Sequence, residues 1–281
     1  MELACERALE PVRARILTWN VARRTSRLPE QAAALAALEL DLLALQEVTE
    51  RTLPLWRAAS AELGLGDAIS SLDGVGARPA PPSRRRTGVL IASRTPLRLS
   101  APLEVPWPET AAAATAKTPA GPIELHAVHV PNAANGWVKP RTLQAIRAGL
   151  ALLDPAPRVL CGDLNIPRRE VSEDEVISFA RDSRGRLRPE RGHEWDEAEL
   201  GVVPGLRDLG FRDAFRTLHG YRDRSPSWTW RQIAGHGGGW RIDHVFCSRE
   251  LRPVSCLYHH GWRDEGLSDH APLEAQLERA F

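Results

Sequence analysis

The segment with the clearest chemical capacity lies near the middle of the chain. An apolar run at 159–161 leads into Gly162, and a carboxylate (Asp163) and an amide (Asn165) follow. The apolar run is typical of a buried strand, and if strand geometry continues, Asp163 and Asn165 point to the same face. Polar groups at the end of a buried strand cost desolvation free energy unless something uses them. The alternative is an ordinary turn, because Gly, Asp and Asn all favour turns.

The same layout recurs along the chain, where apolar segments run into polar side chains. These side chains are Asn20, Glu47, His129 with Asn132, Asp163 with Asn165, and Asp243, and the pair Asp269-His270 precedes the last strand. Carboxylate and amide oxygens suit a hard cation such as Mg²⁺ or Mn²⁺. A histidine beside an aspartate indicates an imidazole kept basic by a carboxylate. The set fits attack of a metal-organised water on a phosphodiester.

Each residue also has a purely structural interpretation. Asn20 could cap the turn after its strand, Glu47 could pair with a surface arginine, and His129 could be a buried histidine with satisfied hydrogen bonds. Asp269 could be a helix cap or a turn residue. Six polar strand ends in one chain are hard to explain by turn chemistry alone, so we interpret them together as one site.

The elements that must position these residues are strands and helices spread over the whole chain. Periodicity and turn residues predict strands at 14–21, 41–45, 87–93, 96–103, 123–130, 158–163, 240–248, 253–258 and 273–277. Helices are predicted at 29–40, 52–63 and 139–153, with shorter pieces at 194–200 and 205–209. Long loops are predicted at 64–86 and 168–190, the second containing one short helix. This pattern indicates one α/β domain with sheets at its centre.

Composition sets the broad class of the protein. The 281 residues are 43% hydrophobic and 26% charged, which is ordinary for a globular protein. No apolar run reaches the roughly 18 residues of a membrane span. We expect residues 1–14 to be a flexible lead-in and 15–281 a single catalytic domain. Four cysteines without a C-x-x-C pair favour a reduced, cytoplasmic protein. The net charge of +1 argues against coating nucleic acid by bulk charge, but allows a local basic face.

Six motifs in order resemble the endonuclease/exonuclease/phosphatase superfamily over nearly the full chain. They are Thr18-Trp19-Asn20-Val21, Leu45-Gln46-Glu47-Val48, His129-Val130-Pro131-Asn132, Gly162-Asp163-Leu164-Asn165, Arg241-Ile242-Asp243-His244 and Leu267-Ser268-Asp269-His270. Further stretches are most similar to the exodeoxyribonuclease III / AP endonuclease branch, namely 130–133, 213–216, 228–230 and 239–243. Two features depart from that branch. Its enzymes usually carry Tyr at the position of His129, and residues 66–86 lack its usual pattern.

The resemblance implies a four-layer α/β sandwich, with two packed mixed β-sheets flanked by helices. It also implies a divalent cation, Mg²⁺ or Mn²⁺, and a role for each motif residue. Glu47 would be the main metal ligand with help from Asn20, and Asp269 would be a further metal or water contact. Asp163 would orient or deprotonate the attacking water, Asn165 would hold the phosphate, and His270, paired with Asp243, would stabilise the transition state. His129 would complete the catalytic set, and Asn132 would contact substrate.

Two functions remain open on the sequence alone. The first is a DNA nuclease acting at abasic sites or 3′ ends, in which Trp228 and Trp240 form a pocket or stacking wall. Arg84, Arg85 and Arg86 would then contact DNA phosphates. The structural alternatives are core tryptophans and a solvated loop. The second function is hydrolysis of a small phosphate ester or lipid headgroup. A binding module without catalysis is a third, disfavoured because every motif position is present. We expect a monomer.

Overall fold

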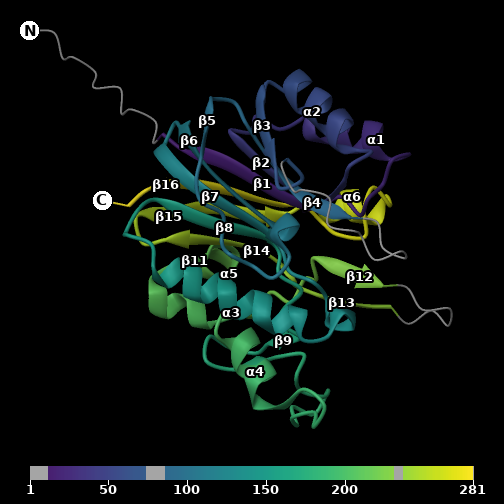
Figure 1. The fold of residues 1–281 in the computed structure, drawn as a ribbon, viewed down its shortest axis with the longest axis vertical. Coiled ribbons are helices and arrows are strands. Elements are labelled where there is room, and N and C mark those ends of the chain that lie inside the picture. Colours follow the sequence, from purple (N-terminus) through teal and green to yellow (C-terminus); the bar gives the residue numbers. More distant parts are fainter. Residues whose placement is uncertain (1–11, 74–85, 231–236, 281) are drawn as a thin grey trace, which may run out of the picture.

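Two six-stranded mixed sheets packed face to face form the centre of the molecule (Figure 1). The computed structural model describes residues 12–73, 86–230 and 237–280. The first sheet has the order β15-β16-β1-β2-β4-β3, and the second has the order β11-β14-β8-β7-β6-β5. Each contains one parallel pair, β1 with β2 and β7 with β8. None of the helices in the described residues has the length and apolar character needed to span a bilayer.

The first sheet is covered on its outer face by helices from the N-terminal part of the chain. Its strands are β1 (Ala14–Asn20), β2 (Leu42–Thr49), β3 (Asp67–Ser70), β4 (Thr87–Ser93), β15 (Leu251–Tyr258) and β16 (Leu273–Arg279). The helices on this side are α1 (Leu28–Leu35) and α2 (Leu53–Glu62), with the short α6 (His260–Asp264) at one end. Residues Leu17 and Trp19 point outward from β1 into the core beneath these helices.

The second sheet is covered by helices from the middle of the chain. Its strands are β5 (Leu97–Leu99), β6 (Ala111–Thr118), β7 (Gly121–His129), β8 (Arg158–Asp163), β11 (Phe211–Asp213) and β14 (Asp243–Ser248). The covering helices are α3 (Val138–Ala151) and α4 (Gly192–Leu200). Helix α5 (Ala214–His219) instead packs against β14 and β15 and adds Ala214 and Phe215 to the core between the sheets. The 3₁₀ turns are η1 (Pro108–Thr110), η2 (Ala133–Asn135) and η3 (Gly205–Leu209). Two small ribbons complete the fold, β9 (Arg169–Glu170) with β10 (Val176–Ile177), and β12 (Trp228–Trp230) with β13 (Gly238–Trp240).

The inter-sheet core decides where the polar strand ends point. Alternate residues such as Ile16 on β1, Ala44 on β2, Val159 on β8 and Val245 on β14 fill the space between the sheets. Because side chains alternate along a strand, residues an even number of positions further along the same strand face the same space. Asn20, Asp163 and Asp243 therefore lie at one end of the inter-sheet core.

The predicted four-layer sandwich is confirmed, and several boundaries are corrected. The first helix ends at Leu35, not at residue 40, because the chain turns to bury Leu40. The supposed loop at 64–86 contains β3, which pairs with β4. The segment 168–190 holds β9 and β10 in place of the expected short helix. There Ser178 donates to Asp196 and the Phe179 amide donates to Glu199, which holds the backbone in a non-helical path.

Two further predicted boundaries differ from the structure. The strand predicted at 240–248 is split into β13 and β14 by a break at residues 241–242. There the Arg241 guanidinium turns inward to a buried contact with Glu170. Strand β1 begins at Ala14, so the last residue of the predicted lead-in belongs to the sheet, while residues 1–11 lie outside the described residues.

Candidate active site

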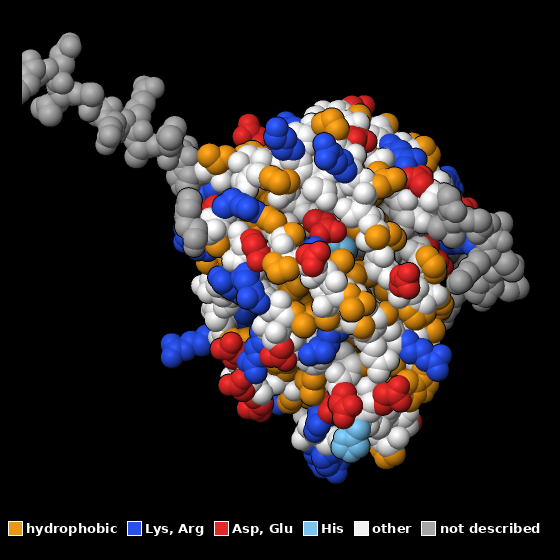
Figure 2. Space-filling model, turned by 60° about the vertical axis from the view of Figure 1, so that its left-hand side comes forward, with side chains coloured by type: hydrophobic (Ala, Val, Ile, Leu, Met, Phe, Trp, Pro, Cys, Tyr) orange, Lys and Arg blue, Asp and Glu red, His pale blue; other side chains and the backbone are white. Residues whose placement is uncertain are grey.

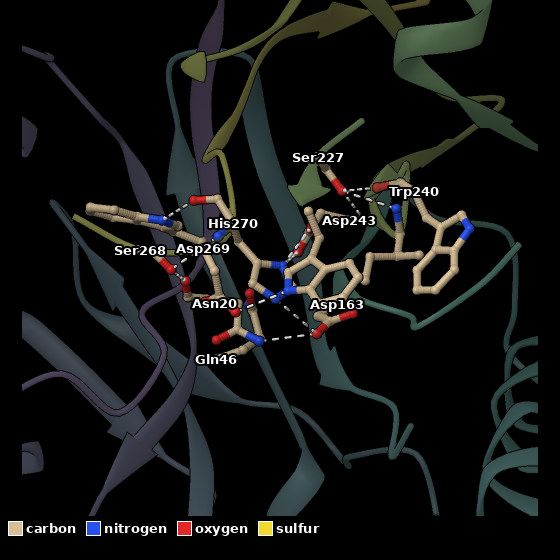
Figure 3. A network of polar contacts seen from close by, with 12 residues as sticks. Asn20, Gln46, Asp163, Ser227, Trp240, Asp243, Ser268, Asp269 and His270 are labelled. Carbon is tan, nitrogen blue, oxygen red and sulfur yellow. Dashed lines mark hydrogen bonds and ion pairs between the residues drawn. The ribbon is translucent and has the colours of Figure 1, made fainter. Parts of the chain in front are cut away.

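Strand register brings the polar strand ends into one place. In the second sheet His129 is the register partner of Asp163, and Asp163 is the register partner of Asp243. In the first sheet Asn20 is paired with Gln46. The two rows face each other at the end of the inter-sheet core (Figure 3). The Nδ2 atom of Asn20 donates to Oδ2 of Asp163 at 3.0 Å, which joins the two sheets directly.

An aspartate–histidine pair forms the buried centre of the site. Nδ1 of His270 lies 2.9 Å and 3.2 Å from the two carboxylate oxygens of Asp243. Its Nε2 points toward Asp163, with 3.9 Å to Oδ2. Burial by itself would lower the pKa of His270, but the charge of Asp243 and its hydrogen bond raise this pKa to about 10, with Asp163 contributing. The imidazole is therefore a cation at neutral pH, fixed between two carboxylates.

Asp163 is a buried carboxylate at the end of β8. Its Oδ2 accepts the hydrogen bond from Asn20, and its Oδ1 accepts the backbone N–H of Asn165 at 2.9 Å. Burial, and after it the charge of the neighbouring Asp243, raise its pKa to about 6 against the opposing effects of His270 and His129. A carboxylate with this pKa is ionised at pH 7 and still basic enough to accept a proton.

Glu47 reaches the site through an irregularity in β2. The β2–β4 register shifts between Leu45 and Val48, and Glu47 has a φ of +59°, in the left-handed region. A bulge of this kind redirects a side chain. Oε1 of Glu47 lies 3.7 Å from Nε2 of His129, and Oε2 lies 2.9 Å from Nε of Arg23. The surface ion pair considered as an alternative for Glu47 is thus present, beside the other strand ends.

The donor set fits a hard divalent cation. Glu47 and Asp163 offer carboxylate oxygens, and Asn20 offers an amide oxygen with a second lone pair besides the one that accepts the Ala22 N–H. Nε2 of His129 lies 3.7 Å from Oε1 of Glu47 and 3.7 Å from Oδ2 of Asp163, so the two carboxylates lie on either side of one imidazole. A second grouping brings ligand atoms of Asp163, Asp243 and His270 within 4.8 Å of one another, but there the imidazole and the Asp243 carboxylate are already hydrogen-bonded to each other.

Residues 162–165 are both the end of a buried strand and a turn, the two interpretations that the sequence allowed. Strand geometry ends at Asp163, and Asn165 has a φ of +51°, so the extended path assumed from the sequence does not continue. Nδ2 of Asn165 donates to the Val130 carbonyl at 2.8 Å. Gly162 has a φ of +134°, and a Cβ there would lie 1.9 Å from the Val128 carbonyl oxygen. Only glycine allows β8 to lie this close to β7 at the site.

The remaining predicted residues lie around the rim. The carboxylate of Asp269 accepts the indole N–H of Trp228 at 2.9 Å, and Asn132 caps η2 by accepting the Ala134 N–H. Trp228 and Trp240 stack on each other with centroids 5.3 Å apart, and the Trp228 ring lies 6.4 Å from His270. Arg86 pairs with Glu50 at 4.0 Å, whereas Arg84 and Arg85 lie outside the described residues.

Sequence reasoning missed the residues that hydrogen-bond to the backbone of Asp243 and His270. Nε1 of Trp19 donates to the His270 carbonyl at 3.0 Å, and the Tyr258 hydroxyl donates to the Asp243 carbonyl at 2.6 Å. The buried Ser227 hydroxyl accepts the Asp243 N–H. Trp19 and Ser227 each stand beside a residue singled out in the sequence, which is a usable signal, but nothing in the sequence around Tyr258 points to the site.

Known proteins resemble the chain in both sequence and structure. The endonuclease/exonuclease/phosphatase family matches residues 17–270. A DNA repair nuclease APEX1 from Danio rerio is 33% identical over 159 residues, which cover 53% of this chain and 47% of that protein. The chain therefore spans about half the length of this curated relative.

Solved structures share the fold. An AP endonuclease from Archaeoglobus fulgidus superposes with a TM-score of 0.66 at 23% identity, covering 93% of this chain and 98% of that chain. An endonuclease/exonuclease/phosphatase from Beutenbergia cavernae gives 0.67 at 19% identity, covering 95% and 72%. The 3′ phosphatase NExo from Neisseria, bound to a product DNA hairpin, gives 0.62 at 23% identity, covering 95% and 100%. The family match runs from before Asn20 to His270 and so includes all the motif residues. The chain belongs to the endonuclease/exonuclease/phosphatase family.

Proposed function

We propose that the protein is a divalent-metal-dependent phosphodiesterase that acts on DNA, at abasic sites or 3′ ends. The observation that carries the proposal is the ionisable Asp163, buried between His270 and Asn20 and facing Glu47 through His129. The relatives support DNA as the substrate, because one is named a DNA repair nuclease and two solved structures are titled an AP endonuclease and a 3′ phosphatase bound to DNA.

In the proposed mechanism the metal ligands, the carboxylate of Asp163 and the imidazole of His270 have separate roles. Glu47 and Asn20 would hold Mg²⁺ or Mn²⁺, with Asp269 as a further contact, and the bound cation would neutralise charge on the phosphate and acidify water. Asp163 would orient the attacking water and accept its proton, since its pKa of about 6 leaves it ionised at pH 7. His270, held by Asp243, would present a cationic Nε2–H to the phosphate.

The rim would then select the substrate. Asn165 would hold the phosphate, and Asn132 would contact the substrate, with His129 in the catalytic set. The stacked pair of Trp228 and Trp240 next to His270 would form one wall of a pocket for a sugar without its base. We place the site in the exodeoxyribonuclease III / AP endonuclease branch on these grounds.

A second candidate is hydrolysis of a small phosphate ester or lipid headgroup. The net charge is only +1, and acidic and basic side chains are interspersed on the face drawn in Figure 2. His129, in place of the tyrosine usual in the DNA-repair branch, also favours this candidate.

The deciding experiment is a Mg²⁺-dependent cleavage assay on duplex DNA that carries one abasic site. Inositol phosphate and sphingomyelin are run in parallel, with Asp163→Asn as the inactive control. We expect strand cleavage at the abasic site by the wild type alone. A clear preference for one of the small esters over abasic DNA would favour the second candidate.

A further inference from the structure

Ser227 is a fully buried residue whose polar groups are all engaged near the Asp243–His270 pair. Its hydroxyl oxygen accepts the backbone N–H of Ile242 at 2.9 Å and that of Asp243 at 3.1 Å. Its own N–H and its hydroxyl both donate to the Trp240 carbonyl. The chain from 240 to 243 therefore wraps around one hydroxyl group, as Figure 3 shows.

The same residue also contacts the segment that carries the histidine. The Ser227 carbonyl accepts the Ala271 N–H at 2.7 Å, and Thr229 donates its N–H to the Asp269 carbonyl at 3.3 Å. Trp228 forms a β-bridge with His270. The segment from Ser227 into β12 is thus the backbone partner of the His270 segment, while the Ser227 hydroxyl accepts the Asp243 N–H.

We propose that Ser227 is a positioning residue, which fixes Asp243 against His270 through its hydroxyl group. The Asp243 backbone is held at its N–H by Ser227 and at its carbonyl by Tyr258, which fixes the position from which its carboxylate reaches His270. The His270 segment is held by backbone hydrogen bonds to Ser227 and Thr229. The inference rests on the proposed function only in treating the pair as catalytic.

The hydroxyl can be removed without touching the strand pairing. Ser227→Ala keeps the backbone bonds to Ala271 and Trp240, but leaves the buried N–H groups of Ile242 and Asp243 without their acceptor. An unsatisfied buried donor moves toward another partner or toward water. We expect Asp243 to shift, which would loosen its hydrogen bond to His270.

Ser248 provides a matched control on the same strand, β14. It is buried, its hydroxyl accepts the Arg158 N–H at 3.0 Å, and it donates to the Ala156 carbonyl at 2.8 Å. It stands at the opposite end of β14 from Asp243. Ser248→Ala therefore removes an equivalent hydroxyl, and should lower thermal stability similarly without touching the site.

The test compares the two variants by two readouts, one of which is independent of activity. The first is the proton NMR signal of the His270 Nδ1–H in metal-free protein, which a hydrogen bond to Asp243 shifts downfield and protects from exchange. The second is the split between kcat and KM on abasic DNA. We expect Ser227→Ala to lose or broaden the NMR signal and to lower kcat by about 10- to 100-fold with little change in KM. We expect Ser248→Ala to leave both readouts unchanged.

The outcomes separate the inference from the proposed function. If Ser227→Ala retains the Nδ1–H signal and has the same kcat as Ser248→Ala, the inference is overturned while the proposed function stands. If the wild type cleaves no phosphodiester but the signal is lost only in Ser227→Ala, the positioning role stands and the proposed function fails. Should Ser227→Ala not fold, Ser227→Cys, with a weaker acceptor, should show a partial loss of the same signal.

Discussion

Asp163→Asn should make the protein more stable while removing its activity. Asp163 is buried, and its pKa rises from an ordinary 3.8 to about 6. At 1.36 kcal/mol per unit, the ionised carboxylate costs the folded state about 3 kcal/mol at neutral pH. The isosteric amide avoids this cost, which is already net of the attraction to His270, but it loses a charge-assisted hydrogen bond worth about 1–2 kcal/mol. We therefore expect a net gain of about 1–2 kcal/mol in the free energy of unfolding.

The stability difference between Asp163→Asn and the wild type should depend on pH in a defined direction. Because the folded-state pKa of Asp163 is raised, its cost is absent below pH 3.8, grows as the pH rises toward 6, and is complete above that. The stability gap between the variant and the wild type should be widest near pH 7.5 and nearly closed at pH 4.5. Urea unfolding of both proteins in EDTA at the two pH values measures it.

Asp213 provides a control with the opposite sign. Its carboxylate lies 2.7 Å from Nη2 of Arg241 and 3.0 Å from Nδ1 of His244. Burial would raise its pKa, but these partners hold the pKa well below its usual range. Asp213→Asn leaves the buried Arg241 charge less compensated, and should destabilise the protein by about 3–5 kcal/mol. An Asp163→Asn variant that is less stable than the wild type at pH 7.5, or a gap that does not change with pH, would refute the reasoning.

Three further predictions follow from particular contacts. Gly162→Ala should cost more than about 3 kcal/mol, because its Cβ would overlap the Val128 carbonyl, and a melting temperature within two or so degrees of the wild type would contradict this. Arg23→Gln should tighten Mg²⁺ binding severalfold in calorimetry, because the Arg23 guanidinium pairs with Glu47, so an unchanged affinity would show that the pair does not compete. Replacing 84–86 with alanines should flatten the salt dependence of DNA affinity and leave kcat nearly intact, whereas an unaltered slope would exclude this segment from DNA contact.

The convergence of the site was predictable because it follows from strand periodicity. Asp163, Asp243 and Asn20 have the same parity as the inter-sheet residues of their strands, so apolar alternation alone places them at one end of the core. Even the alternatives read from the sequence are present, since Asn20 accepts the Ala22 N–H as a turn cap and also donates to Asp163.

Other features depend on contacts between distant segments. The bulge that presents Glu47 is a register shift between β2 and β4, which no local pattern in β2 specifies. The non-helical path near Phe179 follows from a hydrogen bond to Glu199, twenty residues away in sequence. Ser227 adjoins the 228–230 stretch, but its contact with Asp243 depends on Ile242 and Asp243, which lie 15 and 16 residues further along the chain.

Cleavage of abasic duplex DNA with and without divalent cation, by the wild type and by Glu47→Gln, tests the central claim most directly. Glutamine keeps the size of the side chain but removes the charge offered to the cation. We expect the wild type to be inactive in EDTA and fully restored by added Mg²⁺, and Glu47→Gln to remain at least about 100-fold slower at saturating DNA and moderate Mg²⁺. Wild-type cleavage that persists in EDTA, or a Glu47→Gln variant with full activity, would contradict the account.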